Sequence, residues 1–145
     1  FRRRRIGFIF QQYNLVSMLD VYKNITLPIR LDGRRVDKAF LEQIVQTLGI
    51  EKKLANRPNE LSGGQQQRVA IARAIASKPA LVLADEPTGN LDSRTSEEVM
   101  GLLQMTSRKF GQTVMMITHN EEIAQLADRI IHIEDGRIVG GGQNV

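Results

Sequence analysis

The chain has 145 residues, of which 41% are hydrophobic and 25% charged, a composition typical of one globular domain. Its net charge is +4, and Arg2–Arg5 account for that excess, so basic charge is not spread along a surface as in a general nucleic-acid-binding domain. Cysteine is absent and no apolar run approaches ~18 residues, which excludes disulfides, thiolate sites and a membrane-spanning helix.

The first half of the chain begins with a strand signal and continues into helical periodicity. The apolar run 6–10 predicts a buried strand. In the mixed segment that follows, Pro28 is expected to break any helix and residues 32–33 to form a turn. From Asp37, apolar residues recur every three or four positions, which predicts a helix with Asp37 as its N-cap and Gly49 as its C-terminal cap.

Strands and helices alternate through the second half, which predicts an α/β fold. Ser62 and Gln65 fit a capping box at the start of an Ala-rich helix that ends near Pro79. The apolar run 80–84 lacks polar alternation, which is typical of a parallel strand covered on both faces. The remaining expected elements are helices over 93–109 and 121–127, strands over 113–118, 129–133 and 137–139, a hairpin turn at 135–136 and a flexible tail at 140–142.

Two adjacent carboxylates, Asp85 and Glu86, end the predicted strand 80–84. Open α/β sheets bind ligands at the carboxyl ends of their strands. In a nucleotide hydrolase the first acid would hold Mg²⁺ and the second would orient the attacking water. A solvated acidic turn is the alternative interpretation.

The run Leu-Ser-Gly-Gly-Gln at 61–65 opens the Ala-rich helix. Gly63 and Gly64 would let a phosphate approach the backbone closely, and the amides of a helix N-terminus favour its negative charge. Ser62 adds a hydroxyl donor. A tight loop with a capped helix is the alternative, although that structure needs only one of the two glycines.

Two further polar residues follow predicted strands. His119 comes directly after the strand 113–118, where it could contact a terminal phosphate or the attacking water. Gln11 ends the strand 6–10, and its amide could join a water and Mg²⁺ network, a role for which Gln12 competes. Taken singly, each is also explained as an ordinary surface residue.

The motifs in this order resemble the nucleotide-binding subunit of an ABC transporter. They are Phe-Gln at 10–11, Leu-Ser-Gly-Gly-Gln at 61–65, the strand into Asp85-Glu86, Gly-Asn-Leu-Asp at 89–92, and His119. Within the family, the sequences around 7–15 and 84–92 resemble ATPases of the lipoprotein-release, macrolide-export and antimicrobial-peptide-resistance group.

The resemblance implies a role for each matching residue, with ATP and Mg²⁺ as ligands. The intact subunit would hydrolyse ATP and drive a membrane permease through MgATP-dependent dimerisation. The implied roles are Gln11 as the Q-loop glutamine near Mg²⁺, Ser62, Gly63, Gly64 and Gln65 as the signature loop facing the partner subunit's ATP, Asp85 as the Walker B acid on Mg²⁺, Glu86 as the catalytic base, Asp92 as the D-loop acid and His119 as the switch histidine.

The resemblance also implies an architecture. A P-loop NTPase-like (RecA-like) core with a parallel sheet would comprise residues 1–12 and 78–145. An α-helical subdomain would be inserted over 13–77. Its early apolar residues, Tyr13, Leu15, Met18 and Leu19, would either line a groove for a permease helix or belong to the subdomain core.

The phosphate-binding half of such a site is missing, because no lysine follows a glycine as a P-loop requires. We therefore expect the chain to be a piece of a longer subunit, incomplete in its core and inactive alone. The intact subunit is expected in the cytoplasm, peripheral on the inner face of the membrane, in a homodimer bound to a permease of the lipoprotein-release or macrolide-export type.

Other functions remain as alternatives. A non-transport ABC ATPase acting on DNA or the ribosome is one, although too few positions separate Gln11 from Leu61 for the long coiled coil of the DNA-associated kind. A degenerate regulatory relative is another. A binding module using Arg2–Arg5 for RNA or anionic lipid is the third, and the motifs themselves imply no nucleic-acid partner.

Overall fold

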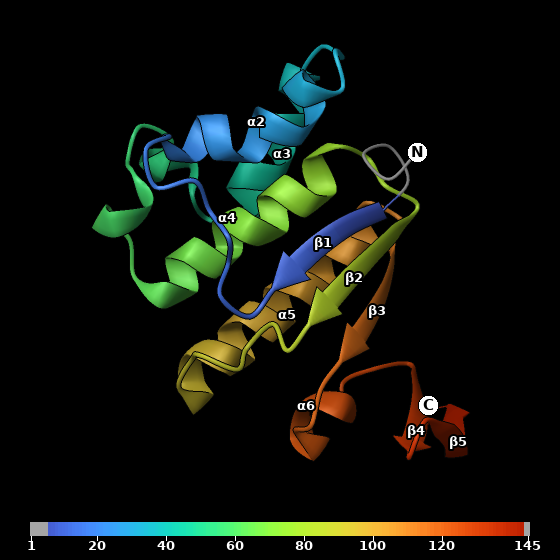
Figure 1. The fold of residues 1–145 in the computed structure, drawn as a ribbon. Helices are drawn as coiled ribbons and strands as arrows, with labels where there is room; N and C mark the ends of the chain where they lie inside the picture. The colour runs from blue at the N-terminus through green and yellow to red at the C-terminus, as the bar shows by residue number, and fades with distance from the viewer. Residues whose placement is uncertain (1–5, 144–145) are drawn as a thin grey trace.

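The computed structural model describes residues 6–143, so Arg2–Arg5 lie outside the described part of the chain. Three parallel strands form its central sheet: β1 (Ile6–Phe10), β2 (Leu81–Asp85) and β3 (Thr113–Ile117), in the order β1-β2-β3. All three point the same way, toward the bottom of Figure 1. The predicted α/β class and the three strands are confirmed.

Helices connect the strands. Between β1 and β2 the chain forms α2 (Val21–Leu31), α3 (Lys38–Thr47) and α4 (Gly63–Ala76), which gather on one side of the molecule (Figure 1). Helix α5 (Ser93–Lys109) connects β2 to β3. The other elements are short turns of 3-10 helix at Glu51–Lys53 and Pro58–Glu60, helix α6 (Glu121–Ala124), and an antiparallel hairpin of β4 (Arg129–Glu134) and β5 (Arg137–Gln143). Within residues 6–143, no helix is both long and apolar enough to cross a membrane.

Helix α4 packs against one face of the sheet. Side chains on this face are buried, including Ile9 and Val82 at 0% exposure and Ala84 at 2%. Gly7 permits the close approach, since a Cβ at this position would lie 2.6 Å from the carbonyl oxygen of Ala74 in α4. The core therefore lies between this face and the helices.

The opposite face is apolar as well, but no helix of residues 6–143 covers it. Phe8 and Phe10 stack at 5.9 Å between ring centroids, and each is 37% exposed. Met115 and Ile117 on β3 are 58% and 61% exposed. The apolar run of β2 predicts a strand covered on both faces, and the described residues cover one.

Helix caps follow the sequence signals. Asp37, Ser62 and Asp92 are the N-caps of α3, α4 and α5, and each accepts a hydrogen bond from the backbone amide three residues later. Gly49 stands one residue beyond the C-cap Leu48 and adopts a left-handed φ of 69°, as expected for a glycine that ends a helix.

The prediction at Pro28 was wrong, because Pro28 lies inside α2. A proline within a helix costs about 3 kcal/mol. Burial of Val21, Ile25 and Ile29 on one side of the helix outweighs that cost, because each buried aliphatic side chain contributes about 1.5–3 kcal/mol.

The prediction of a flexible tail at 140–142 was also wrong. These glycines belong to β5 and pair with β4, Gly140 with His132 and Gly142 with Ile130. The turn at Asp135-Gly136, where both residues have positive φ, sets the register of this hairpin. The pairing of β5 with β4 then continues through the three glycines, because backbone hydrogen bonds require no side chain.

Candidate functional site

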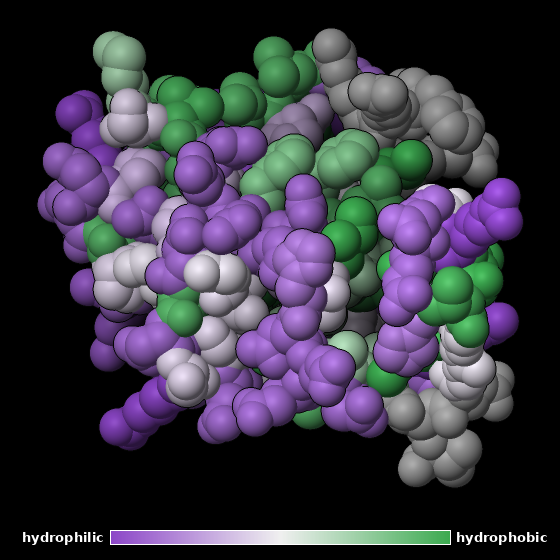
Figure 2. Space-filling model, turned by 60° about the horizontal axis from the view of Figure 1, so that its bottom comes forward, coloured by the Kyte–Doolittle hydropathy of each residue, from purple (hydrophilic) through white to green (hydrophobic). Residues whose placement is uncertain are grey.

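The predicted site residues on the strands meet at one edge of the sheet. Phe10 is aligned with Asp85, and Asp85 with Ile117. Gln11, Glu86 and His119 follow these strand ends, so parallel pairing brings them to the same carboxyl edge. Figure 2 turns this edge toward the viewer, and hydrophilic side chains cover its left and centre, with hydrophobic ones toward the top and right.

Glu86 and His119 are in direct contact. The backbone amide of His119 donates to Glu86 Oε1 at 3.0 Å, and His119 Nε2 lies 3.5 Å from the same oxygen. Glu86 has a left-handed φ of 47°, and its own amide donates to the carbonyl of Ile117. The Glu86 side chain is 22% exposed and that of His119 is 96% exposed. This arrangement holds a carboxylate at the sheet edge with an imidazole beside it, open to solvent.

Gln11 reaches the loop that follows β2. Its Nε2 donates to Asn90 Oδ1 at 3.1 Å, and Asn90 Nδ2 donates back to the carbonyl of Gln11 at 3.1 Å. A Cβ at Gly89 would lie 2.6 Å from Gln11 Nε2, so this glycine makes room for the amide. Sequence reasoning missed Asn90, although the motif at 89–92 contains it.

Asp85 and Gln11 suit a magnesium site that relies on its substrate for most ligands. Among residues 6–143 no cluster of three or more His, Asp or Glu side chains could hold a metal on its own. Mg²⁺ is commonly held by one or two carboxylates together with phosphates and water. The exposed carboxylate of Asp85 fits that pattern. Gln11 at the same sheet edge has an amide oxygen that accepts no hydrogen bond among residues 6–143, so this oxygen could serve as a further ligand.

Ser62 and Gln65 form the predicted capping box at the start of α4. Ser62 Oγ accepts from the Gln65 amide at 3.2 Å, and Gln65 Oε1 accepts from the Ser62 amide at 2.9 Å. Packing is tight at both glycines and tighter at the second: a Cβ would lie 3.0 Å from the Tyr13 hydroxyl at Gly63 and 2.6 Å from Thr95 Cγ2 at Gly64. In this fold, packing thus gives Gly64 a structural reason that is independent of phosphate binding, and at Gly63 the space is also limited.

Asp92 lies where α5 begins, close to the start of α4. Its carboxylate accepts from the Thr95 amide at 2.8 Å. Hydrogen bonds from the Thr95 amide and hydroxyl, with Arg94 nearby, lower the pKa of Asp92. The side chain is thus an ionised N-cap, and Thr95, which donates to it, lies close to Gly64 in the Ser62–Gln65 turn.

Gln67 is a buried residue that sequence reasoning missed. Its Nε2 donates to the carbonyl of Phe10 at 3.2 Å and also to the carbonyl of Pro87. The side chain is 0% exposed. One amide on α4 therefore ties together the residue before Gln11 and the residue after Glu86. Its position two residues after the motif at 61–65 was the available signal.

Comparison with known proteins gives one consistent result. The sequence model of a family described as ABC transporter matches residues 1–89. The uncharacterized ABC transporter ATP-binding protein MJ0796 of Methanocaldococcus jannaschii is 45% identical over 144 residues, covering 94% of this chain and 61% of that protein. The macrolide export ATP-binding/permease protein MacB of Syntrophobacter fumaroxidans is 45% identical over 141 residues, 94% of this chain and 20% of that protein.

Solved structures agree with the sequence matches. A dimeric structure of the MJ0796 cassette bound to ADP and Pi, described as a post-hydrolysis state, superposes with a TM-score of 0.79 and 39% identity, covering 99% of this chain and 65% of that one. The structure of cbiO1 from Clostridium perfringens superposes at 0.86 with 28% identity, covering 98% and 58%. The chain thus spans about three-fifths of the length of MJ0796 and of cbiO1. Its fold is that of ATP-binding cassettes, which confirms the predicted P-loop NTPase-like class.

Proposed function

Because this chain belongs to the ABC transporter family, as an ATP-binding domain, we propose that it serves a subunit that hydrolyses ATP to drive a membrane permease. The observation that carries the proposal is the carboxyl edge of the sheet, where Glu86 and His119 are in contact beside Asp85 and Gln11. A partly buried carboxylate next to a metal-binding carboxylate is the arrangement that activates water for phosphoryl transfer.

Each residue at this edge has a distinct task in the proposed reaction. Asp85 and the Gln11 amide oxygen would hold Mg²⁺, which when bound offsets charge on the phosphate oxygens. Glu86 accepts a hydrogen bond from the attacking water and aligns it with the terminal phosphate. His119, exposed beside Glu86, donates to a terminal phosphate oxygen and keeps the Glu86 carboxylate in place.

The turn at Ser62–Gln65 is proposed to act on the nucleotide of a second copy. Two observations support this: the turn begins α4 with the amides and dipole that favour a phosphate, and the similar MJ0796 cassette forms a dimer in its ADP-bound and Pi-bound structure. Asp92, which caps α5 where Thr95 lies close to Gly64 of the same turn, would sense the partner subunit. The two copies would close on MgATP and open after hydrolysis.

A permease would dock on the segment after Gln11. Of the apolar residues predicted for a groove, Leu15 packs against the core, whereas Met18 is 79% exposed. The similar MacB protein is named for ATP-binding and permease parts together, which supports a permease of the macrolide-export type. We place the subunit in the cytoplasm, on the inner face of the membrane.

Replacement of Glu86 by Gln in the full-length protein tests the proposal. ATP hydrolysis should fall at least about 100-fold, the range of general-base contributions, while ATP binding is kept. Glu134→Gln, which removes an exposed carboxylate from β4, is the matched control and should leave turnover unchanged. Wild-type turnover in Glu86→Gln would contradict the role of Glu86.

The 145-residue chain itself is expected neither to bind ATP tightly nor to hydrolyse it. None of its lysines follows a glycine, so it has no segment to cradle the phosphates as a P-loop does. A calorimetric titration with MgATP measures this. Micromolar affinity together with normal turnover would show that the chain needs no further phosphate-binding segment.

A further inference from the structure

The segment that follows Gln11 has an unusual backbone. Tyr13 and Asn14 both have left-handed conformations, with φ of 66° and 53°. Left-handed backbone is unfavourable for a bulky residue such as Tyr13, whereas Asn adopts it more readily. Within the turn, the Tyr13 amide donates to the carbonyl of Phe10 at 3.2 Å and the Asn14 amide to that of Gln12 at 2.7 Å. The question is what holds this pair.

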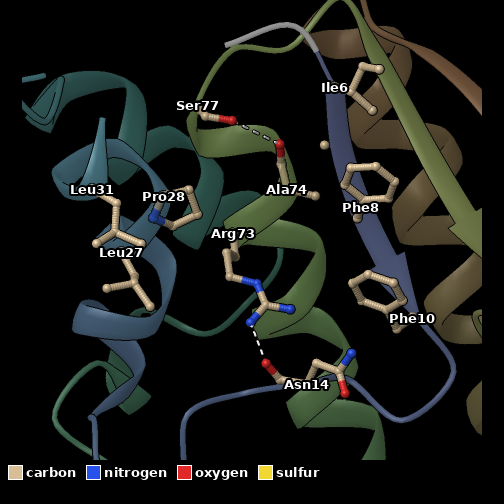
Figure 3. A pocket seen from close by; sticks show the side chains of 11 residues that line it. Ile6, Phe8, Phe10, Asn14, Leu27, Pro28, Leu31, Arg73, Ala74 and Ser77 are labelled. Carbon is tan, nitrogen blue, oxygen red and sulfur yellow. Dashed lines mark hydrogen bonds between the residues drawn. The ribbon is translucent and has the colours of Figure 1, made fainter. Parts of the chain in front are cut away.

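Arg73 on α4 contacts the carbonyls of these two residues. Its Nη2 donates to the Tyr13 carbonyl and its Nη1 to the Asn14 carbonyl, each at 2.7 Å. Figure 3 shows the guanidinium in the groove between β1 and α2, directed at Asn14. The two carbonyls therefore present their oxygens to one fork of charged donors, and a hydrogen bond with a charged donor is stronger than one between neutral groups.

No carboxylate of residues 6–143 forms an ion pair with Arg73; the described ion pairs involve other residues. Burial lowers the pKa of the guanidinium, which still remains charged at neutral pH. Burying a cation without a carboxylate partner costs free energy, which its hydrogen bonds must offset. The bonds it makes within the described chain go to the two left-handed residues.

The other side of Gln11 is held as well. Gln67, also on α4, donates to the carbonyl of Phe10, and Asn90 binds Gln11 through both its carbonyl and its side chain. Gln11 and its neighbour Gln12 thus lie between two points that α4 fixes, Phe10 on one side and Tyr13-Asn14 on the other. Helix α4 also begins with the Ser62–Gln65 turn.

We propose that Arg73 is a positioning residue for Gln11: its guanidinium fixes the left-handed pair Tyr13-Asn14 and so joins the Gln11 segment to the helix that begins with the Ser62–Gln65 turn. Any movement of α4 then carries the Gln11 segment with it. The part of the proposal that concerns ATP rests on the function proposed above for Gln11. The hydrogen bonds of Arg73 to Tyr13 and Asn14 are present in the protein without nucleotide.

Amide hydrogen exchange of the full-length protein without nucleotide tests whether Arg73 fixes the Tyr13-Asn14 pair. In Arg73→Met and Arg73→Lys, exchange at residues 12–15 should become about tenfold faster, because charge-assisted hydrogen bonds are lost, with Lys the milder change since it retains one. Arg68→Lys is the matched control: it lies on the same helix, pairs with Glu98, and should leave residues 12–15 unchanged.

A second readout separates positioning from general weakening. In Arg73→Lys, kcat for ATP should fall several-fold with a smaller change in KM, while the urea midpoint stays near that of Arg68→Lys. If Arg73→Met fails to fold, Arg73→Lys alone decides. Unchanged exchange in Arg73→Lys, or equal acceleration in Arg68→Lys, overturns the proposal. Turnover retained in Glu86→Gln would instead refute the proposed function and leave the exchange result standing.

Discussion

The two faces of the β1-β2-β3 sheet have similar apolar side chains but different surroundings. On the face toward α4, Ile9 and Val82 are fully buried and Gly7 admits the helix backbone. On the other face, Met115 and Ile117 remain more than half exposed within residues 6–143. Within residues 6–143 the proposed catalytic edge is therefore supported from one side, and mutations on the two faces should have unequal effects.

The largest difference is expected between two isoleucines of this sheet. Ile9→Ala should lower the free energy of unfolding of the 145-residue chain by about 3 kcal/mol, because it opens a cavity beneath α4. Ile117→Ala on the open face should cost below about 1 kcal/mol. Urea denaturation of both variants measures the pair. Equal losses would contradict the difference between the faces.

A smaller effect is expected where the α4 and α5 helices meet. Gly64→Ala places a Cβ 2.6 Å from Thr95 Cγ2 and should destabilise the chain by about 1–3 kcal/mol through overpacking. Gly101→Ala, in the middle of α5, meets nothing within 4 Å and should stabilise it by about 0.5–1 kcal/mol. Thermal unfolding compares the two. A change in melting temperature of the same sign in both variants would argue against the close packing at Gly64.

The open face should also promote association of the 145-residue chain. Met115→Lys is expected to weaken self-association about tenfold, because a charge interrupts the exposed apolar patch. Met105→Lys places the same change on α5, where Met105 is 47% exposed, and should have little effect. Sedimentation over a concentration series measures both. A monomeric wild-type chain at every concentration would show that the open face does not associate.

The smallest effect concerns pH and the N-cap of α3. A hydrogen bond from Lys78, with a second from the Phe40 amide, lowers the pKa of Asp37 below its ordinary value of 3.8. A lowered pKa in the folded state stabilises the protein above pH 3.8, and this contribution is lost as the pH falls through the folded value. The melting-temperature difference between wild type and Asp37→Asn should therefore shrink below about pH 4. Lys78→Met removes the largest cause of the lowered pKa, so Asp37 should lose its stabilising effect over a narrower range of pH. A melting-temperature difference between wild type and Asp37→Asn that stays constant with pH would contradict this linkage.

Local signals explain what could be predicted from the sequence. Asp37 and Ser62 each accept a hydrogen bond from the amide three residues later, so the sequence of one helical turn was enough to predict their cap roles. Asp92 caps α5 in the same way, although its cap role was not predicted. Helix 93–109 was predicted with the bounds that α5 has. The carboxyl edge was predictable too, since Glu86 and His119 each come soon after an apolar run that reads as a strand.

Contacts between distant segments explain what could not be predicted. Pro28 opposes a helix locally, and only the burial of its neighbours in the tertiary fold outweighs that preference. The hydrogen bonds of Arg73 to Tyr13 and Asn14 cross about 60 positions. Gly140 and Gly142 were assigned to a tail because they lack side chains, although their backbone groups pair with β4.

The pairing of β1 with β2 has a consequence for how the chain folds. Ile6 aligns with Leu81, and Gln11 bonds to Asn90 from 79 positions away, with three helices between. Such non-local contacts carry a large loop-closure entropy and slow folding. On a translating ribosome, Gln11 emerges long before Asp85 and Asn90 do. Within residues 6–143, helix α4 is made later than β1 but earlier than β2, so β1 can pack against α4 before it pairs with β2.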